Sequence, residues 1–172
     1  MAFFSGASRL RVVSRTEFAA DAAVGVRAGL LLTVAAAAAW LSGAPAVFPS
    51  LGPSAFVLST DRPGPSARTV VGGHAVGVLA GLLSYAAVAS LVPVPATPLS
   101  FDPPWLVLSG VLAVSLTSAG MRAARCVHPP ACATTLIVGL GLLEPAAALV
   151  VVVPAVASLL VVDRTLGDRL RR

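Results

Sequence analysis

Four apolar runs, each long enough to cross a lipid bilayer, constrain the fold of this chain more than any other feature. They cover residues 24–44, 69–91, 104–121 and 145–162. As helices that rise about 1.5 Å per residue they reach roughly 27–35 Å, against a hydrocarbon core of about 30 Å. Pro154 lies inside the last run and is expected to kink it. The sequence therefore predicts an all-α membrane protein.

Composition agrees with this prediction and excludes other classes of protein. Hydrophobic residues make up 57% of the 172 residues and charged residues only 11%. Soluble domains are about 45–50% apolar and about 25% charged. The net charge is +5, but the basic residues are scattered arginines without interleaved aromatic residues. We therefore expect a lipid bilayer as partner, no nucleic acid, and a single membrane domain over residues 1–172 with no soluble module.

Two further apolar segments, 47–60 and 127–143, are shorter and interrupted by proline. The first contains Pro49, Gly52 and Pro53, and the second opens with Pro129 and Pro130. Because proline suits the first turn of a helix, each segment is predicted to be an extended stretch followed by a half-helix that starts at its second proline. Non-helical backbone at membrane depth must be covered by protein, so both segments are expected inside the helix bundle.

The distribution of arginine favours six membrane crossings over four. If both short segments cross, every arginine lies at the inner face, and the outer loops carry only Asp102 and Glu144. If both re-enter instead, four arginines fall outside, namely Arg62, Arg68, Arg122 and Arg125. The predicted topology is therefore six crossings with both termini in the cytoplasm, although full crossing and re-entry stay open for the short segments.

The order of segments also predicts an internal repeat. Each half of the chain has a full span, a broken segment and a full span, and three crossings per half place the halves upside down relative to each other. The predicted parts are a cytoplasmic N-terminal segment 1–22, a first repeat 23–92, a second repeat 104–163 and a basic cytoplasmic tail 164–172.

A few polar residues fall at membrane depth, chiefly Ser54, His74, His128 and Thr134. Buried ionisable residues in membranes usually face a cavity or a partner. His128 precedes a predicted half-helix whose unpaired N–H groups would attract an anion, and the predicted half-helix at Pro53 offers the same feature. The alternative is structural: both histidines can serve as hydrogen-bonding links between helices, and the hydroxyls can bond back to their own helices.

Catalytic and metal sites are not expected. None of the carboxylates lies near the predicted midplane, so a nucleophile would lack an orienting group. The side chains that could bind a metal do not follow a zinc-ligand spacing: His74, Cys126, His128 and Cys132. The sequence therefore predicts a protein that is not an enzyme and has no cofactor.

Three ordered motifs make the chain similar to the HPP family of small integral membrane proteins. They are Gly52-Pro53-Ser54-Ala55, Arg68 followed by Gly72-Gly73-His74, and His128-Pro129-Pro130-Ala131 with Thr134. The resemblance covers about residues 20–163 and implies transport of a small anion, because family members in chloroplasts and cyanobacteria are described as nitrite transporters. Departures are Cys132, where a glycine is expected, six predicted crossings where four are often described, and no soluble regulatory domain such as some relatives carry.

Together these features predict a small-anion transporter or channel, with nitrite as one candidate substrate, in a prokaryotic plasma membrane. The expected substrate-binding residues are Gly52, Pro53, Ser54, His74, His128, Pro129, Pro130 and Thr134. Arg68 and Arg125 are expected to attract the anion at the inner mouth, and a protonated histidine would make the flux depend on pH.

The alternative function is a non-transporting membrane scaffold or assembly subunit. A homo-oligomer is also expected, because small residues allow close helix packing: Gly77, Gly81, Gly110, Gly139 and Gly141. The sequence leaves open the anion, the coupling ion, the number of subunits, and whether passage is channel-like or by alternating access.

Overall fold

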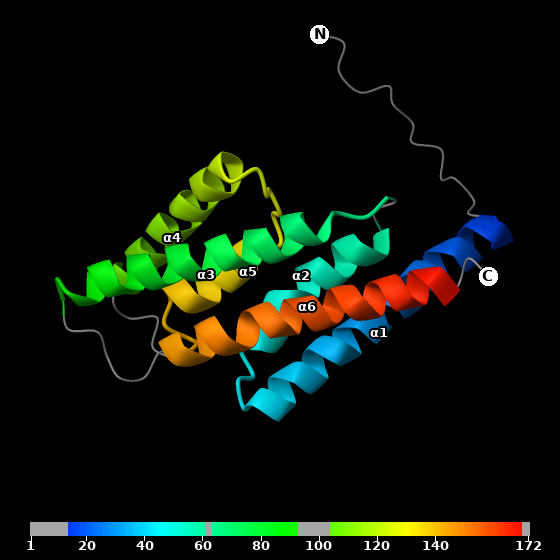
Figure 1. The fold of residues 1–172 in the computed structure, drawn as a ribbon, viewed down its shortest axis with the longest axis horizontal. Helices are drawn as coiled ribbons and strands as arrows, with labels where there is room; N and C mark the ends of the chain where they lie inside the picture. Colours follow the sequence, from blue (N-terminus) through cyan, green and yellow to red (C-terminus); the bar gives the residue numbers. More distant parts are fainter. Residues whose placement is uncertain (1–13, 61–62, 93–103, 170–172) are drawn as a thin grey trace, which may run out of the picture.

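The computed structural model describes residues 14–60, 63–92 and 104–169, and every regular element within these ranges is an α-helix (Figure 1). The helices are α1 (Arg15–Ser42), α2 (Val47–Thr60), α3 (Ala67–Ala89), α4 (Pro104–Ala123), α5 (Ala131–Gly139) and α6 (Pro145–Arg169).

Four of these helices match the four predicted spans. Helices α1, α3, α4 and the Pro145–Leu166 part of α6 are long and apolar enough to cross a membrane. Helix α1 starts earlier than predicted because Ser14 and Glu17 form a capping box at its N-terminus. Large apolar side chains remain exposed on the outer faces, including Trp40, Leu83 and Val150. Within the described residues these helices support the prediction of an integral, helical membrane protein, since a bilayer can cover such an apolar surface.

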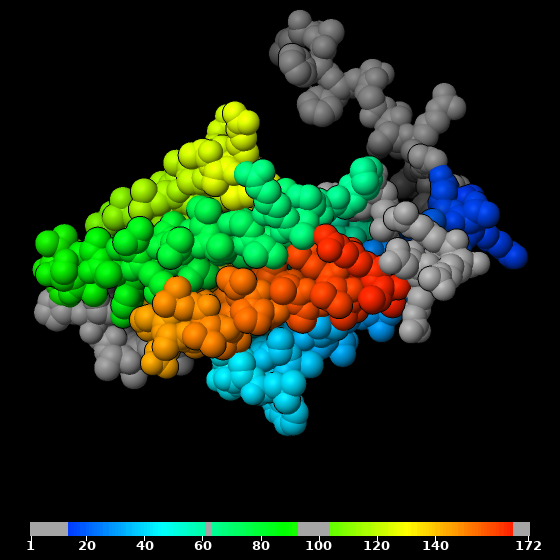
Figure 2. Space-filling model, viewed as in Figure 1, coloured from blue at the N-terminus to red at the C-terminus, as the bar shows by residue number. Residues whose placement is uncertain are grey.

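Successive helices run in alternating directions along the long axis of the molecule (Figure 1). The start of α1 and the end of α6 therefore lie at the same end of the bundle. Helices α3 and α6 lie side by side on the face shown in Figure 2, with α4 along one flank and α1 along the other. The short helices α2 and α5 contact each other beneath this pair.

The set of helix pairs in substantial contact with each other stays the same when the two halves of the chain are exchanged. Replacing α1 by α4, α2 by α5 and α3 by α6 turns the substantial contacts into one another. The α3–α4 contact becomes α6–α1, α3–α5 becomes α6–α2, and α1–α2 becomes α4–α5. The α2–α5 and α3–α6 contacts map onto themselves.

The predicted break in the first short segment is wrong. Helix α2 is continuous from Val47 to Thr60 and passes through Gly52 and Pro53, where a half-helix was expected to begin. The amides of Val47 and Phe48 bond to carbonyls of the preceding turn, which starts the helix early. Pro53 removes a single helical hydrogen bond, and its exposed ring does not collide with the core.

The second short segment contains a short irregular stretch and a nine-residue helix. Residues 126–128 have no regular structure, and α5 begins at Ala131, directly after Pro129 and Pro130. Helix α5 ends at Gly139, before the predicted end at residue 143, because Gly141 adopts a left-handed φ of 68°. The amide of Leu142 then bonds to the carbonyl of Ile137 at 2.9 Å and closes the helix.

Candidate functional site

Four buried polar side chains form one continuous chain of hydrogen bonds in the core. The hydroxyl of Ser54 lies 2.8 Å from Nε2 of His74 and 3.0 Å from Nε2 of His128. Nδ1 of His74 lies 2.8 Å from the hydroxyl of Thr134. The two imidazole rings are 5.4 Å apart between centroids and tilted by 55°. We call Thr134, His74, Ser54 and His128 the histidine bridge.

The histidine bridge joins four parts of the chain. Ser54 comes from the middle of α2, His74 from α3, His128 from the segment before α5, and Thr134 from α5. These side chains are between 0% and 2% exposed. Buried polar groups are costly without partners, so each hydrogen bond of the bridge also holds helices together.

Glycines on α3 allow the second half of the chain to approach closely enough to form the bridge. A Cβ atom on Gly73 would lie 2.7 Å from Cβ of His128, and one on Gly77 would lie 2.7 Å from the hydroxyl of Thr135. Gly81 faces Val138 in the same way. The spacing of four residues places these glycines on one face of α3, against α5 and the segment that carries His128.

The N-terminus of α5 does not provide the free anion-binding amides that were predicted. The amides of Ala131, Cys132 and Ala133 donate to the carbonyls of His128, Pro129 and Pro130 at 2.9–3.1 Å. Since α2 begins at Val47, no helix N-terminus lies at Pro53 either. The expected anion site between two half-helix N-termini is therefore wrong, and polar side chains occupy the core instead.

The other four predicted substrate-binding residues differ in how deeply they are buried. Pro130 is buried, Gly52 is partly buried, and Pro53 and Pro129 are exposed. The two exposed prolines shape the backbone beside Ser54 and His128. Their rings do not belong to the buried bridge.

The two predicted inner-mouth arginines lie at the same end of the bundle, and both are exposed. Nη2 of Arg68 donates to the carbonyl of Ala124 at 3.4 Å, next to Arg125. Arg125 has a left-handed φ of 53° and ends α4, with the amide of Cys126 bonded to the carbonyl of Met121 at 2.9 Å. Two positive charges therefore lie at the start of the segment that leads to His128.

Two buried polar contacts were not predicted from the sequence. The hydroxyls of Thr117 and Thr135 lie 2.9 Å apart, beside the bridge. Arg27 of α1 forms an ion pair with Asp163 of α6, and its Nη2 also donates to the Asp163 carbonyl at 3.2 Å. The available signal was Arg27, the one charged residue within the apolar run 24–44, and Asp163, which directly follows the run 145–162.

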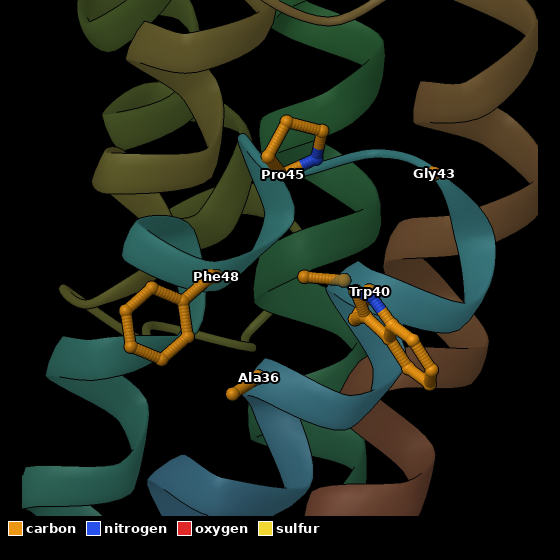
Figure 3. Close-up of a pocket in the computed structure, with 6 residues that line it drawn as sticks. Ala36, Trp40, Gly43, Pro45 and Phe48 are labelled. Carbon is orange, nitrogen blue, oxygen red and sulfur yellow. The ribbon is translucent and has the colours of Figure 1, made fainter.

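A surface pocket lies away from the bridge, where α1 turns into α2. Ala36, Trp40, Gly43, Pro45 and Phe48 line it together with Ala39, and the Trp40 and Phe48 side chains flank Ala36 (Figure 3). The lining carries no titratable side chain, and Trp40 is 82% exposed. Such a surface suits lipid tails, and a tryptophan at a helix end is typical of the membrane interface.

The described part of the chain holds no group of three or more histidine, cysteine or acidic side chains placed to bind a metal ion. Both cysteines are free thiols. The chemistry available at the bridge is therefore that of two imidazoles and several hydroxyls, which can bind an anion or a proton.

The family comparison agrees with the motifs at this site. The family described as "HPP, transmembrane region" matches residues 12–165, which include all six helices up to the end region of α6. No curated protein and no solved structure matches the chain. The match covers nearly the whole chain and includes every residue of the histidine bridge, so the protein belongs to the HPP family of integral membrane proteins.

Proposed function

We propose that this HPP-family protein carries a small inorganic anion across the membrane, that the histidine bridge is the point through which the anion passes, and that nitrite is the first candidate substrate. The observation that carries this proposal is the bridge itself. It is a fully buried polar group in an apolar bundle, with two imidazoles on one hydroxyl. Ionisable residues in membrane cores generally mark substrate or ion pathways.

The proposed topology is six crossings arranged as two inverted repeats, with both termini in the cytoplasm of a prokaryotic cell. The alternating helix directions and the exchange of contacts between the halves support it. In inverted-repeat transporters the substrate site lies where the repeats meet. The bridge has this position, because it joins α2 and α3 of the first half to α5 and its preceding segment in the second.

The bridge is closed by direct hydrogen bonds, which favours an alternating-access carrier over an open channel. An anion can enter only if Ser54 separates from at least one histidine. Arg68 and Arg125 would raise the local anion concentration at the inner end. Neither an enzymatic reaction nor a cofactor is part of this proposal.

The test is uptake of nitrite into proteoliposomes of the purified full chain, with chloride, nitrate and formate as competitors. Saturable uptake is expected in the wild type, and Ser54→Ala should lower it about tenfold or more, because the change removes both hydrogen bonds of the Ser54 hydroxyl in the buried bridge. Ser59→Ala is the matched control, because the hydrogen bond that the Ser59 hydroxyl makes within the described residues goes to the Ala55 carbonyl of its own helix. Folded protein that moves none of these anions would overturn the proposal.

A scaffold role is the second candidate, and the same closed bridge favours it. Direct bonds among four buried side chains also describe a link that fixes helix packing. In that case Ser54→Ala would lower the free energy of unfolding, and no variant would affect anion flux. A homo-oligomer stays a proposal, but the glycines no longer support it, because Gly77, Gly81 and Gly139 pack against helices of the same chain.

A further inference from the structure

We propose that His74 and His128 bind a single proton between them through Ser54, and that this proton enters the site together with the anion. Transport would then couple one proton to one anion. The coupling rests on the proposed function, whereas the shared proton does not. The starting observation is that one serine hydroxyl contacts Nε2 of both rings.

The Ser54 hydroxyl has a single hydrogen, and this determines which ring nitrogens carry hydrogen when both histidines are neutral. Its hydroxyl can donate to only one of the two nitrogens, so the other ring must carry its hydrogen on Nε2 and donate to Ser54. The two neutral rings are therefore opposite tautomers. If His74 carries hydrogen on Nε2, its Nδ1 accepts from Thr134; in the reverse arrangement Nδ1 of His74 donates to Thr134.

One added proton fits this arrangement with all of its hydrogen bonds intact. With His74 protonated on both nitrogens, Nε2 donates to Ser54 and Nδ1 donates to Thr134. The Ser54 hydroxyl then donates to Nε2 of His128. Transfer of the Nε2 proton of His74 to Ser54, with the Ser54 proton passing to His128, moves the charge to the second ring. No atom is gained or lost, so both rings share one proton.

A second proton does not fit. Both Nε2 atoms would then donate to Ser54, whose own hydrogen would lose its acceptor. Two positive rings would also lie 5.4 Å apart inside the bundle. Since like charges in one buried site oppose each other, the pair should bind one proton and stop.

Among the described side chains, none that bonds to the bridge carries a negative charge to balance this proton. No described carboxylate bonds to either ring, and Asp163, on α6, is paired with Arg27 of α1. Helix α2 carries no titratable side chain. The other titratable residues on the elements around the bridge, among those whose side chains the structure describes, are Arg68 and Tyr85 on α3, Arg122 on α4, Arg125 and Cys126 in the segment before α5, Cys132 on α5, and Arg164 on α6, where side chains are described up to residue 166.

An anion is therefore the natural counter-charge for the proton. A positive charge in an apolar core is stabilised by an anion that binds beside it, and the proton in turn strengthens anion binding by the same factor. The anion and the proton then cross as a neutral pair, which avoids moving a net charge through the bilayer.

The shared proton can be tested without any transport. The chain has two histidines, so ¹⁵N-histidine NMR of the full-length protein in lipid nanodiscs reports on the bridge alone. We expect the ¹⁵N signals of both rings to shift over one common pH interval, while the pair takes up one proton in total. Ser54→Thr should keep this behaviour and Ser54→Ala should separate the two rings. Uptake of two protons, or independent rings in the wild type, would overturn the shared proton.

The coupling needs a second measurement in proteoliposomes. An inward nitrite gradient should drive proton uptake in a one-to-one ratio, measured with an entrapped pH dye, and Ser59→Ala should keep that ratio. A shared proton in the NMR titration with no nitrite flux would overturn the proposed function and the coupling. Nitrite flux without proton movement would overturn the coupling and leave the proposed function intact.

Discussion

Gly73 and His128 come so close together that a Cβ atom on the glycine would lie 2.7 Å from Cβ of the histidine. The sulfur of Met121 and the carbonyl of Cys126 occupy the other sides of the same space, at 3.4 and 3.3 Å. Backbone and packed side chains cannot give way easily at such distances. Gly73 therefore sets how closely the segment that carries His128 approaches α3.

Gly73→Ala should displace His128 and open the bridge. We expect a loss of about 1–3 kcal/mol in the free energy of unfolding, typical of overpacking in a core, and a clear fall in nitrite uptake. Gly25→Ala is the control, because a Cβ on Gly25 meets nothing within 4 Å. Denaturation in detergent and uptake in proteoliposomes measure the two effects. Equal behaviour of the two variants would show that the close approach is not important.

The Arg27–Asp163 pair should hold α1 to α6. Arg27 is 7% exposed and the Asp163 side chain 15% exposed, so either partner left alone would be a poorly hydrated charge. Asp163→Asn or Arg27→Gln should each lower the free energy of unfolding by about 3 kcal/mol. The double variant should lose less than the sum of the single losses. Strictly additive losses in this double-mutant cycle would mean that the two residues do not interact.

Arg125 combines an unfavourable backbone conformation with a positive charge near the inner end. Its φ of 53° is costly for a residue with a side chain, and Arg125→Gly should raise the free energy of unfolding by about 1 kcal/mol. The same change should slow nitrite uptake at low ionic strength, because a charge that attracts the anion is lost. Arg122→Gln is the charge control on the same exposed turn. Greater stability with unchanged uptake would assign Arg125 a backbone role alone.

The six-crossing topology predicts which loops face which side. Ser66 precedes α3 and Glu144 precedes α6, and both are exposed. In a background without the native cysteines, Ser66→Cys should react with a membrane-impermeant thiol reagent only from the cytoplasmic side. Glu144→Cys should react only from outside. Labelling of Ser66→Cys from outside would mean that α2 re-enters.

The sequence was sufficient to predict the four long apolar helices and to single out the polar residues that form the histidine bridge. Helices α1, α3, α4 and α6 follow from long apolar runs, because a bilayer permits few alternatives to a helix. Ser54, His74, His128 and Thr134 were identifiable because polar residues are rare at membrane depth. Their direct bonding was not predictable, since it depends on glycine contacts between α3 and the second half of the chain.

The wrong predictions came from reading Pro53 as a helix start and from expecting free amides after Pro130. Pro130 does precede a helix, but Pro53 lies inside one, and the carbonyls of Pro129 and Pro130 satisfy the amides that were expected to be free. Proline removes a donor without deciding where a helix begins, and neighbouring helices in a bundle can compensate for the loss. The Arg27–Asp163 pair was missed because its partners are 136 residues apart.

The most direct test of the central claim is nitrite uptake as a function of pH by the wild type and by His128→Gln. Glutamine keeps a polar group near Ser54 but does not titrate. Wild-type uptake should rise as the pH falls, because the histidine pair then takes up its proton and the proton strengthens anion binding. The variant should lose or reshape this dependence. Wild-type and variant curves of the same shape would contradict a role for the histidine bridge in anion passage.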